Sequence, residues 1–494
     1  MKRWLLSLLP LLTANWITLL GSIVTTTSAA AMLTIGIAML LSVDTDQYKA
    51  ALALLVFPSL FVLGLVVVAL GYFVQRLRLR SKGSSVPDPL GDAVRSALSD
   101  DRVRRQIVFV AVATVANVAI VAVAATAATS YMNTPAFCGT LCHSVMQPEY
   151  DTYRESPHSR VDCVTCHIGP GASWAVKAKV DGLRQVLGVL TGNYSRPIPS
   201  PVAELRPARD TCEQCHWPAK FHGNSVAFRS HYANDEANTQ STTALLLKIG
   251  GRDDRTGQFH GIHWHVSPDT EIRYEPLDER REKIGKVQVY SKGELVSEYL
   301  PAQPATGPSQ EPRIMDCIDC HNRPTHVYDL NPSLAVDRLF DSGDLDKAVP
   351  FLHEVATAAL TRAADAKIDR ASADAWFMDQ MAALYREGHP DKSVSDEALA
   401  SAAASVAKLY RLNVYPDMGL TFGAHFNHLG HRGEDKDRRG CFRCHDDEHA
   451  TGDGKKISQD CELCHGFLAM DEDPSGMAEP LKALLPQPPP KPQQ

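Results

Sequence analysis

The cysteines of this chain occur as six pairs, and a histidine directly follows the second cysteine of every pair. The pairs and their histidines are Cys138, Cys142 and His143; Cys163, Cys166 and His167; Cys212, Cys215 and His216; Cys317, Cys320 and His321; Cys441, Cys444 and His445; and Cys461, Cys464 and His465. C-x-x-C-H is the attachment sequence of c-type haem, in which two thiols form thioethers with the porphyrin and the histidine binds its iron. The sequence therefore predicts six covalently bound haem c groups.

Disulfides and zinc sites are the other common uses of paired cysteines. Neither explains the histidines, because a disulfide has no need of one, and structural zinc usually joins two cysteine pairs or one pair with spaced histidines. Six histidines in these positions by chance have a probability on the order of one in a hundred million. The first motif is irregular, since three residues separate Cys138 from Cys142, and its ligand geometry is therefore less certain than that of the others.

Three apolar stretches precede the motifs. Residues 17–42, 49–75 and 106–130 are each long enough to cross a bilayer as a helix. The first follows Lys2 and Arg3 and has small residues at 28–31, which also fits a cleaved secretory signal. Its apolar sequence continues to Leu41, which favours an uncleaved anchor.

Charge predicts the orientation of these spans. The segment 76–105 is rich in arginine, whereas the short segment between the first two spans is acidic. By the positive-inside rule the basic loop is cytoplasmic, so everything after about Tyr131 lies in the periplasm, where haem c is attached. The predicted location is the bacterial cytoplasmic (inner) membrane. Because the whole chain has a net charge of −7, and no nucleotide loop, hydrolase triad or nucleic-acid-binding patch is evident, nucleic-acid binding is not expected.

The expected fold is mainly α: a three-helix transmembrane anchor, then an irregular periplasmic multihaem domain with a small β insertion and a helical segment. In the insertion, Ser291-Lys292-Gly293 is expected to turn a hairpin. The expected parts are an anchor at 1–130, haems one to three at 131–225, the β insertion at 226–310, haem four with the helical segment at 311–415, haems five and six at 416–475, and a disordered tail at 476–494.

Each haem iron also needs a second axial ligand, and other histidines lie close to the motifs. The candidates are His158, His222, His263, His265, His326, His431 and His449. An isolated histidine is usually a surface or structural residue, but the number of vacant positions makes ligation plausible for these. Paired histidine ligation gives low-potential haems, which suits electron entry from menaquinol. Met146 is a further candidate at the first haem, if the unusual spacing displaces His143; an apolar contact is the alternative.

Quinol oxidation releases protons, so bases are needed near the first haem. Lys177, Lys179 and Asp181 lie on the helix expected over residues 171–190, and Glu149 follows the first motif. The default interpretation of such residues is a solvated helix face; the functional one is a quinol site.

The sequence resembles the NapC/NirT family of membrane-anchored multihaem cytochromes. The resemblance rests on FCGTLCHSVMQPEY, YRESPHSRVDCVTCHIGPG and KAKVDG within residues 107–220, and RPARDTCEQCHWPAKFHG, GIHWHVSPDTEIRY, MDCIDCHNRPTHVYDL and GCFRCHDDEH resemble the longer ImcH-like inner-membrane branch. It implies that Lys177 or Lys179, with Asp181, forms the quinol site, and that His158 is a distal ligand. Short family members have one anchor helix and typically four haems, whereas this chain has three expected spans and six motifs.

The sequence thus predicts a quinol dehydrogenase that takes electrons from the menaquinol of the quinone pool and relays them to periplasmic c-type cytochromes. One rival is a terminal reductase of nitrite, hydroxylamine or a sulfur oxyanion, which needs an open haem iron. The other is an electron-transfer subunit of a larger respiratory complex.

Overall fold

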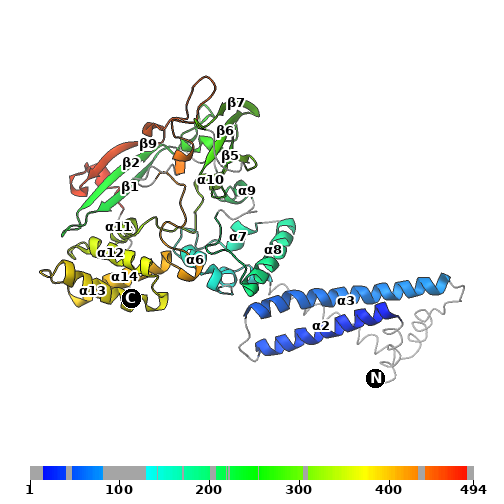
Figure 1. The fold of residues 1–494 in the computed structure, drawn as a ribbon. Coiled ribbons are helices and arrows are strands. Elements are labelled where there is room, and N and C mark those ends of the chain that lie inside the picture. The colour runs from blue at the N-terminus through cyan, green and yellow to red at the C-terminus, as the bar shows by residue number, and fades with distance from the viewer. Residues whose placement is uncertain are drawn as a thin grey trace. The chain divides into compact units, whose positions relative to one another are not determined.

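The structure is a computed structural model of the chain (Figure 1). It describes residues 15–40, 47–81, 129–141, 143–169, 172–200, 207–217, 220, 223–253, 255–303, 310–431 and 440–486. The chain divides into two compact units, one of residues 1–143 with 176–193 and the other of 144–175 with 194–494.

In the first unit, α2 (Trp16–Leu40) and α3 (Gln47–Ser81) form an antiparallel pair. The two backbones approach closely at glycines: a Cβ on Gly64 would lie 2.8 Å from the backbone nitrogen of Thr25, and one on Gly71 would lie 2.7 Å from that of Thr18. Small residues therefore set the spacing of the two helices. The side chain of Asn15 also bridges them, since its Nδ2 donates to the carbonyl oxygen of Gly71 at 2.9 Å.

Over the described residues, no helix combines the length and the apolar composition that crossing a membrane requires. The third expected span, 106–130, lies outside the described residues up to position 128.

Helices carry most of the segments around the first three motifs. They are η1 (Phe137–Leu141), α6 (His143–Arg154), α7 (Cys163–His167), α8 (Ala172–Thr191) and α9 (Ala208–Cys212). The expected helix over 171–190 is confirmed as α8. The segment η1 is a π-helix, whose i→i+5 hydrogen bonds take one residue more per turn than an α-helix. The irregular first motif thus begins, at Cys138, in a turn that accommodates an extra residue.

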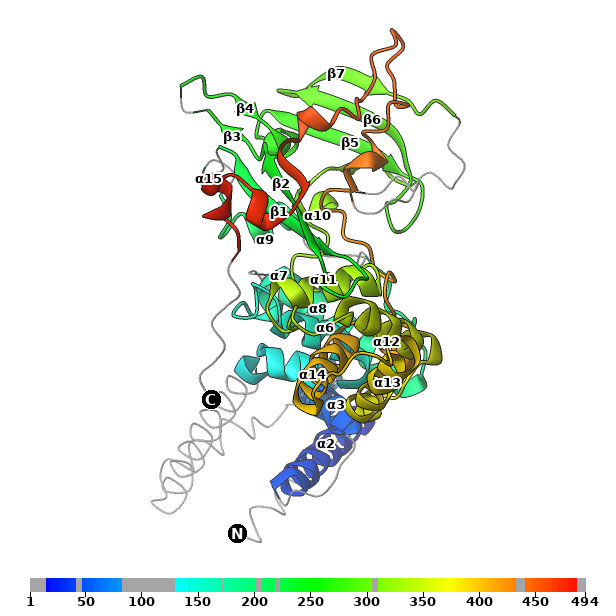
Figure 2. The ribbon, with the colours of Figure 1, turned by 90° about the vertical axis from the view of Figure 1, so that its left-hand side faces the viewer.

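Strands are more extensive than the small insertion expected, so the fold is a mixture of helices and sheets. The strands are β1 (Ser225–Tyr232), β2 (Gln240–Leu247), β3 (Gly251–Arg252), β4 (Phe259–His260), β5 (Thr270–Pro276), β6 (Ile284–Ser291), β7 (Glu294–Tyr299), β8 (Arg313–Ile314) and β9 (His465–Glu472). In the described part of the chain they form three sheets, with the orders β1-β2-β9, β3-β4 and β7-β6-β5-β8 (Figure 2). The antiparallel pairing of β9 with β2 brings in a strand from beyond the expected insertion.

The expected hairpin at Ser291-Lys292-Gly293 is confirmed. Ser291 of β6 pairs with Glu294 of β7, which leaves Lys292 and Gly293 as the turn. Both have positive φ, 50° and 87°, as the two central residues of a type I′ turn require.

The expected helical segment is also confirmed, as four helices of ten or more residues within the described residues 310–431. They are α11 (Pro332–Asp341), α12 (Leu352–Ala366), α13 (Ala373–Gly388) and α14 (Asp396–Asn413). Alanines on α12 and α14 face this core and allow close packing, while Phe377 and Tyr410 fill its centre with ring centroids 5.5 Å apart. Asn331 caps α11 and Ser395 caps α14, each through its side-chain oxygen.

The remaining elements are short. They are η3 (Ile262–Val266), α10 (Cys317–Cys320), η4 (Arg370–Ser372), η5 (Pro416–Met418), η6 (Gly440–Arg443), η7 (Cys461–Leu463), η8 (Pro474–Gly476) and α15 (Glu479–Lys482). Residues 476–486, assigned to a disordered tail from composition, are ordered instead. Leu481 and Leu485 pack against the cluster of Ala244, Ala469 and Met477, and this apolar contact holds the segment on the β1-β2-β9 sheet.

Replacing Phe377 by Ala is expected to lower the free energy of unfolding by about 3–5 kcal/mol, because its completely buried ring leaves a cavity in the helical core. Guanidinium unfolding of the holoprotein, followed by far-UV circular dichroism, measures the change. Asp379→Ala, at an exposed position on the same helix, is the control and should cost less than about 0.5 kcal/mol. Equal losses in the two variants would contradict this packing.

Candidate haem-binding site

The attachment motifs are built on single helical turns. The backbone N–H of His216 donates to the carbonyl oxygen of Cys212 at 2.8 Å, and His321 and His445 repeat this bond with the first cysteines of their motifs. One helical turn places the first and fourth residues on one face, so both thiols of a motif can reach one porphyrin edge. None of the cysteines that the structure describes forms a disulfide bond.

The histidines of five motifs face a second histidine across a nearly constant gap in the described part of the chain. The pairs and their ring-centroid distances are His158 with His216 (6.1 Å), His167 with His326 (6.3 Å), His263 with His321 (6.5 Å), His265 with His445 (5.9 Å) and His431 with His465 (6.2 Å). Two imidazoles on opposite sides of one metal ion have ring centres about 6 Å apart, because each metal–nitrogen bond is about 2 Å long and each ring centre lies about 1 Å further. The gap therefore fits a haem iron. We call these five histidine pairs the facing pairs.

One other histidine pair in the described chain has a different cause. The rings of His231 and His353 lie 6.1 Å apart, yet neither residue follows a cysteine pair. Both rings contact the carboxylate of Asp337, His231 through Nδ1 at 3.0 Å and His353 through Nε2 at 3.1 Å. A shared carboxylate explains their spacing, so the distance indicates haem only in combination with a motif.

Backbone carbonyls orient several rings of the facing pairs. A carbonyl oxygen can only accept, so the ring nitrogen Nδ1 donates in each case, and this leaves Nε2 available for a metal. The contacts are His158 with Pro324 (3.1 Å), His265 with Ile262 (2.7 Å), His326 with Glu149 (2.9 Å) and His445 with Ser458 (2.8 Å).

Burial also favours the neutral imidazole that a metal needs. It lowers the pKa of His326 to about 4, and it lowers the pKa of His167, with a smaller effect from the neighbouring His326. A neutral ring binds metal without first losing a proton.

His449 differs from the other candidates. Its Nδ1 bonds to Asp446 Oδ2 at 2.9 Å, and its Nε2 lies 2.9 Å from the carbonyl oxygen of Gly285. Both ring nitrogens are thus occupied by hydrogen bonds, and the ring is in none of the facing pairs. His222 lies outside the described residues.

Successive motifs also contact one another. Helix α7 contacts α9, and α9 contacts α10. The thiols of Cys212 and Cys317 are hydrogen-bonded, which raises the pKa of Cys212. Burial raises the pKa of Cys320 to about 12, and the neighbouring Cys441 adds to this rise. Burial also raises the pKa of Cys464, again with a smaller contribution from Cys441. The second to sixth motifs therefore follow one another in space in chain order.

The residues considered for a quinol site lie in different surroundings. On α8, Lys177 and Asp181 are four residues apart and share a face, whereas Lys179 is two residues from each and belongs to the opposite face. Lys177 is exposed and Asp181 half-buried.

Glu149, in the second unit, is surrounded by residues that sequence alone does not bring to it. Its carboxylate lies 3.2 Å from His326 Nδ1 and 4.0 Å from Arg323 Nη1. Burial raises its pKa, and Arg323 opposes that rise. Tyr328 adjoins the same carboxylate. Arg323 and Tyr328 have no motif or regular spacing that could reveal this contact.

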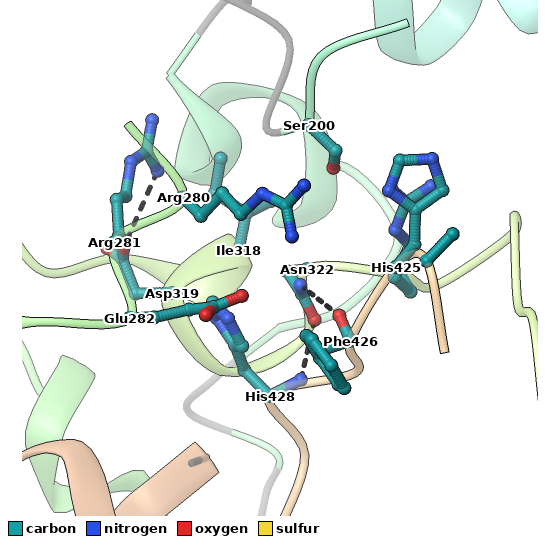
Figure 3. A pocket seen from close by; sticks show the side chains of 12 residues that line it. Ser200, Arg280, Arg281, Glu282, Ile318, Asp319, Asn322, His425, Phe426 and His428 are labelled. Atoms are coloured by element: carbon teal, nitrogen blue, oxygen red, sulfur yellow. Dashed lines mark hydrogen bonds and ion pairs between the residues drawn. The ribbon is translucent and has the colours of Figure 1, made fainter. Parts of the chain in front are cut away.

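A polar pocket adjoins the fourth motif. Its lining includes three arginines, two histidines and two carboxylates: Arg280, Arg281, Arg323, His425, His428, Glu282 and Asp319. Asn322 closes one side of it, because its Nδ2 donates to the carbonyl of Phe426 and its Oδ1 accepts from the N–H of His428, both at 2.8 Å (Figure 3). The Nε of Arg323 and the Nδ1 of His428 are buried without a hydrogen-bond partner within the described protein.

Thiol pairs with adjacent histidines and facing imidazoles define a c-type cytochrome. Residues 101–198 match the NapC/NirT cytochrome c family, N-terminal region. The chain is 38% identical, over 460 residues, to the cytochrome c-type protein ImcH of Geobacter sulfurreducens, an alignment that covers 92% of this chain and 88% of that protein. The chain therefore belongs to the NapC/NirT cytochrome c family, the multihaem cytochromes of electron transfer. No solved structure matches it.

Replacing His428 by Gln is expected to reduce the loss of stability in acid. Burial, with Arg443 adding to it, lowers the pKa of His428 from 6.5 to about 4. Between those values the unfolded chain takes up a proton that the folded protein does not, so stability is lost as pH falls from about 6.5 to 4. Over this pH range the free energy of unfolding should therefore fall by up to about 3 kcal/mol less in the variant than in the wild type. Denaturant unfolding at several pH values measures the difference, with His260→Gln, at an exposed position, as the control. Parallel pH curves for wild type and His428→Gln would contradict the expectation.

Proposed function

We propose that the chain binds six haem c groups, one at each cysteine pair, and that each facing pair supplies the two axial ligands of one iron. The support is the combination in each pair of one motif histidine and one other histidine at the separation that a metal ion requires. Bound haem supplies one-electron chemistry at low potential. His449 then stabilises the fold through Asp446 and Gly285 and binds no iron.

The first motif differs from the others in this proposal. Met146 and His143 belong to α6 and are three residues apart, a spacing that puts them on one face of a helix. Met146 can therefore replace His143 at the iron but cannot face it from the opposite side.

The proposed reaction is oxidation of menaquinol at the periplasmic side of the cytoplasmic membrane, with relay of electrons to periplasmic carriers. Membrane anchorage is supported by the first unit, where many large apolar side chains of α2 and α3 are exposed on the helix pair. They include Trp16, Leu19, Leu20, Ile23, Val62, Leu63, Leu65, Val66, Leu70, Phe73 and Leu77. Exposed apolar surface on this scale is typical of a surface that lipid or another protein covers.

Within this proposal Lys177 and Asp181 are the quinol-site residues. They share a face of α8, so the carboxylate of Asp181 can accept a proton from a quinol headgroup while the ammonium of Lys177 stabilises the quinolate anion that this leaves, before loss of two electrons and the second proton gives the neutral quinone. Glu149 takes a different role. Its carbonyl and carboxylate both contact Nδ1 of His326, so it is a positioning residue for that imidazole. Electrons then pass along the motifs in chain order, because each motif from the second onwards contacts the next.

The single observation that carries the proposal is the set of facing pairs, since paired imidazoles leave no open position on the five irons. A terminal reductase needs such a position. Electron transfer is therefore the function that the geometry supports best.

A pyridine haemochrome assay of the purified protein is expected to give six haems per chain, and the five haems of the facing pairs are expected to be low spin in the resting protein. Alanine at both Cys163 and Cys166 should lower the count by one, because no thiol remains to attach that porphyrin. A wild-type count below six would contradict the cofactor proposal, and high-spin haem in excess of one equivalent per chain would favour a reductase.

Quinol oxidation is tested by the rate at which a water-soluble menaquinol analogue reduces the haems of the detergent-solubilised protein. Lys177→Ala and Asp181→Ala should each lower the rate by roughly 10²-fold, the contribution of one acid–base group. Lys179→Ala removes the same charge from the opposite face of α8 and is the matched control, with little expected effect. Equal losses in all three variants would indicate a general charge effect. Wild-type protein that the analogue does not reduce would favour an electron-transfer subunit that receives electrons from another protein.

A further inference from the structure

Two distal histidines lie on one short turn. His263 and His265 both belong to η3, the 3-10 helix Ile262–Val266, with Trp264 between them. The turn is tied to the segment between β2 and β3, since the N–H groups of Ile262 and His263 donate to the carbonyl oxygens of Lys248 and Ile249 at 2.9 and 3.1 Å. Its position therefore depends on the β insertion, not on any attachment motif.

The two imidazoles face different motifs. His263 lies opposite His321 of the fourth motif with centroids 6.5 Å apart and ring planes nearly parallel, at 6°, whereas His265 faces His445 of the fifth motif at 5.9 Å and 63°. A 3-10 helix has about three residues per turn, so positions i and i+2 lie on different faces. Two histidines separated by one residue on such a turn can therefore serve two irons.

The fourth and fifth motifs are also joined on their attachment side. Arg443 lies between the cysteines of the fifth motif, and Asp319 lies between those of the fourth. The buried guanidinium of Arg443 donates through Nη2 to the carbonyl oxygen of Asp319, and through Nη1 to that of Arg281 at 2.7 Å. The two motifs are thus fixed to each other by a hydrogen bond in the protein interior.

We propose that η3 is a brace for two haems: His263 completes the coordination of the fourth haem and His265 that of the fifth. The inference rests on the proposed haem ligation and deepens it. The hydrogen bond from Arg443 to Asp319 fixes the two attachment motifs to each other, and η3 supplies the ligand on the opposite side of each haem. The five residues of η3 thus set the separation of the two irons. An electron that crosses from the N-terminal haems to the C-terminal haems passes through this junction, leaving one iron oxidised and the other reduced.

The experiment compares His263→Met, His265→Met and the double variant with the wild type, all as full-length holoprotein. Methionine can still bind iron but raises the reduction potential. In a redox titration, each single variant should shift one haem equivalent to higher potential, and the double variant should shift two. His260→Met changes an exposed histidine just before the turn, and it should shift none.

Electron paramagnetic resonance identifies which haem changes. Nearly coplanar axial imidazoles give a rhombic low-spin signal, whereas strongly tilted rings give a single feature at very low field. The pair of His263 and His321 is the most coplanar of the facing pairs, with 31° the next smallest angle. The most rhombic signal should therefore disappear in His263→Met and persist in His265→Met.

A second set of variants guards against misfolding. In His263→Gly and His265→Gly, added imidazole should return one haem equivalent each from high spin to low spin. Any of three results would overturn the proposal that η3 ligates both irons. They are failure of imidazole to restore low spin, a double variant that shifts only one haem, and loss of the same signal in both single variants. A wild-type count of six haems in the same preparation would show that the cofactor proposal stands while the brace fails, and a lower count would show that the cofactor proposal itself fails.

Discussion

The separation of about 6 Å between facing imidazoles is the constraint on which the second unit depends. In the proposed ligation each of these irons takes one ligand from its attachment motif and the other from a different segment. For the second motif that segment lies far along the chain, since His326 faces His167. The backbone carbonyls that hold Nδ1 of these rings then fix their orientation. Loops and short turns are stabilised by these contacts in place of a large continuous apolar core.

A more ordinary core exists where haem motifs are absent. Helices α11 to α14 bury Phe377, Tyr410 and a layer of alanines, and Tyr232 of β1 stacks on Phe340 of α11 at 4.7 Å. This bundle anchors the β1-β2-β9 sheet, which leads through β3 and β4 to η3. The bundle thus provides a rigid base for the segment that carries His263 and His265.

Sequence reasoning predicted the parts that depend on local spacing. The helices α8 and α11 to α14 and the turn at Lys292-Gly293 follow from periodicity and turn chemistry. Proximity along the chain also identified most histidines of the facing pairs, but it could not assign their partners. His158 precedes the second motif and faces His216 of the third, and His326 follows the fourth motif and faces His167 of the second. His449 was chosen by the same proximity, yet Asp446 and Gly285 occupy both its nitrogens. These partners are set by tertiary packing, which spacing does not encode.

The strand β9 begins at His465, the histidine of the last motif, and pairs with β2, which lies soon after the third. The edge of β2 consequently stays open until the sixth motif and the residues of β9 that follow it have been synthesised and have folded. An uncovered strand edge is a template for aggregation. Chains that lack the segment after the sixth motif therefore expose a strand edge of β2 that β9 covers in the full structure.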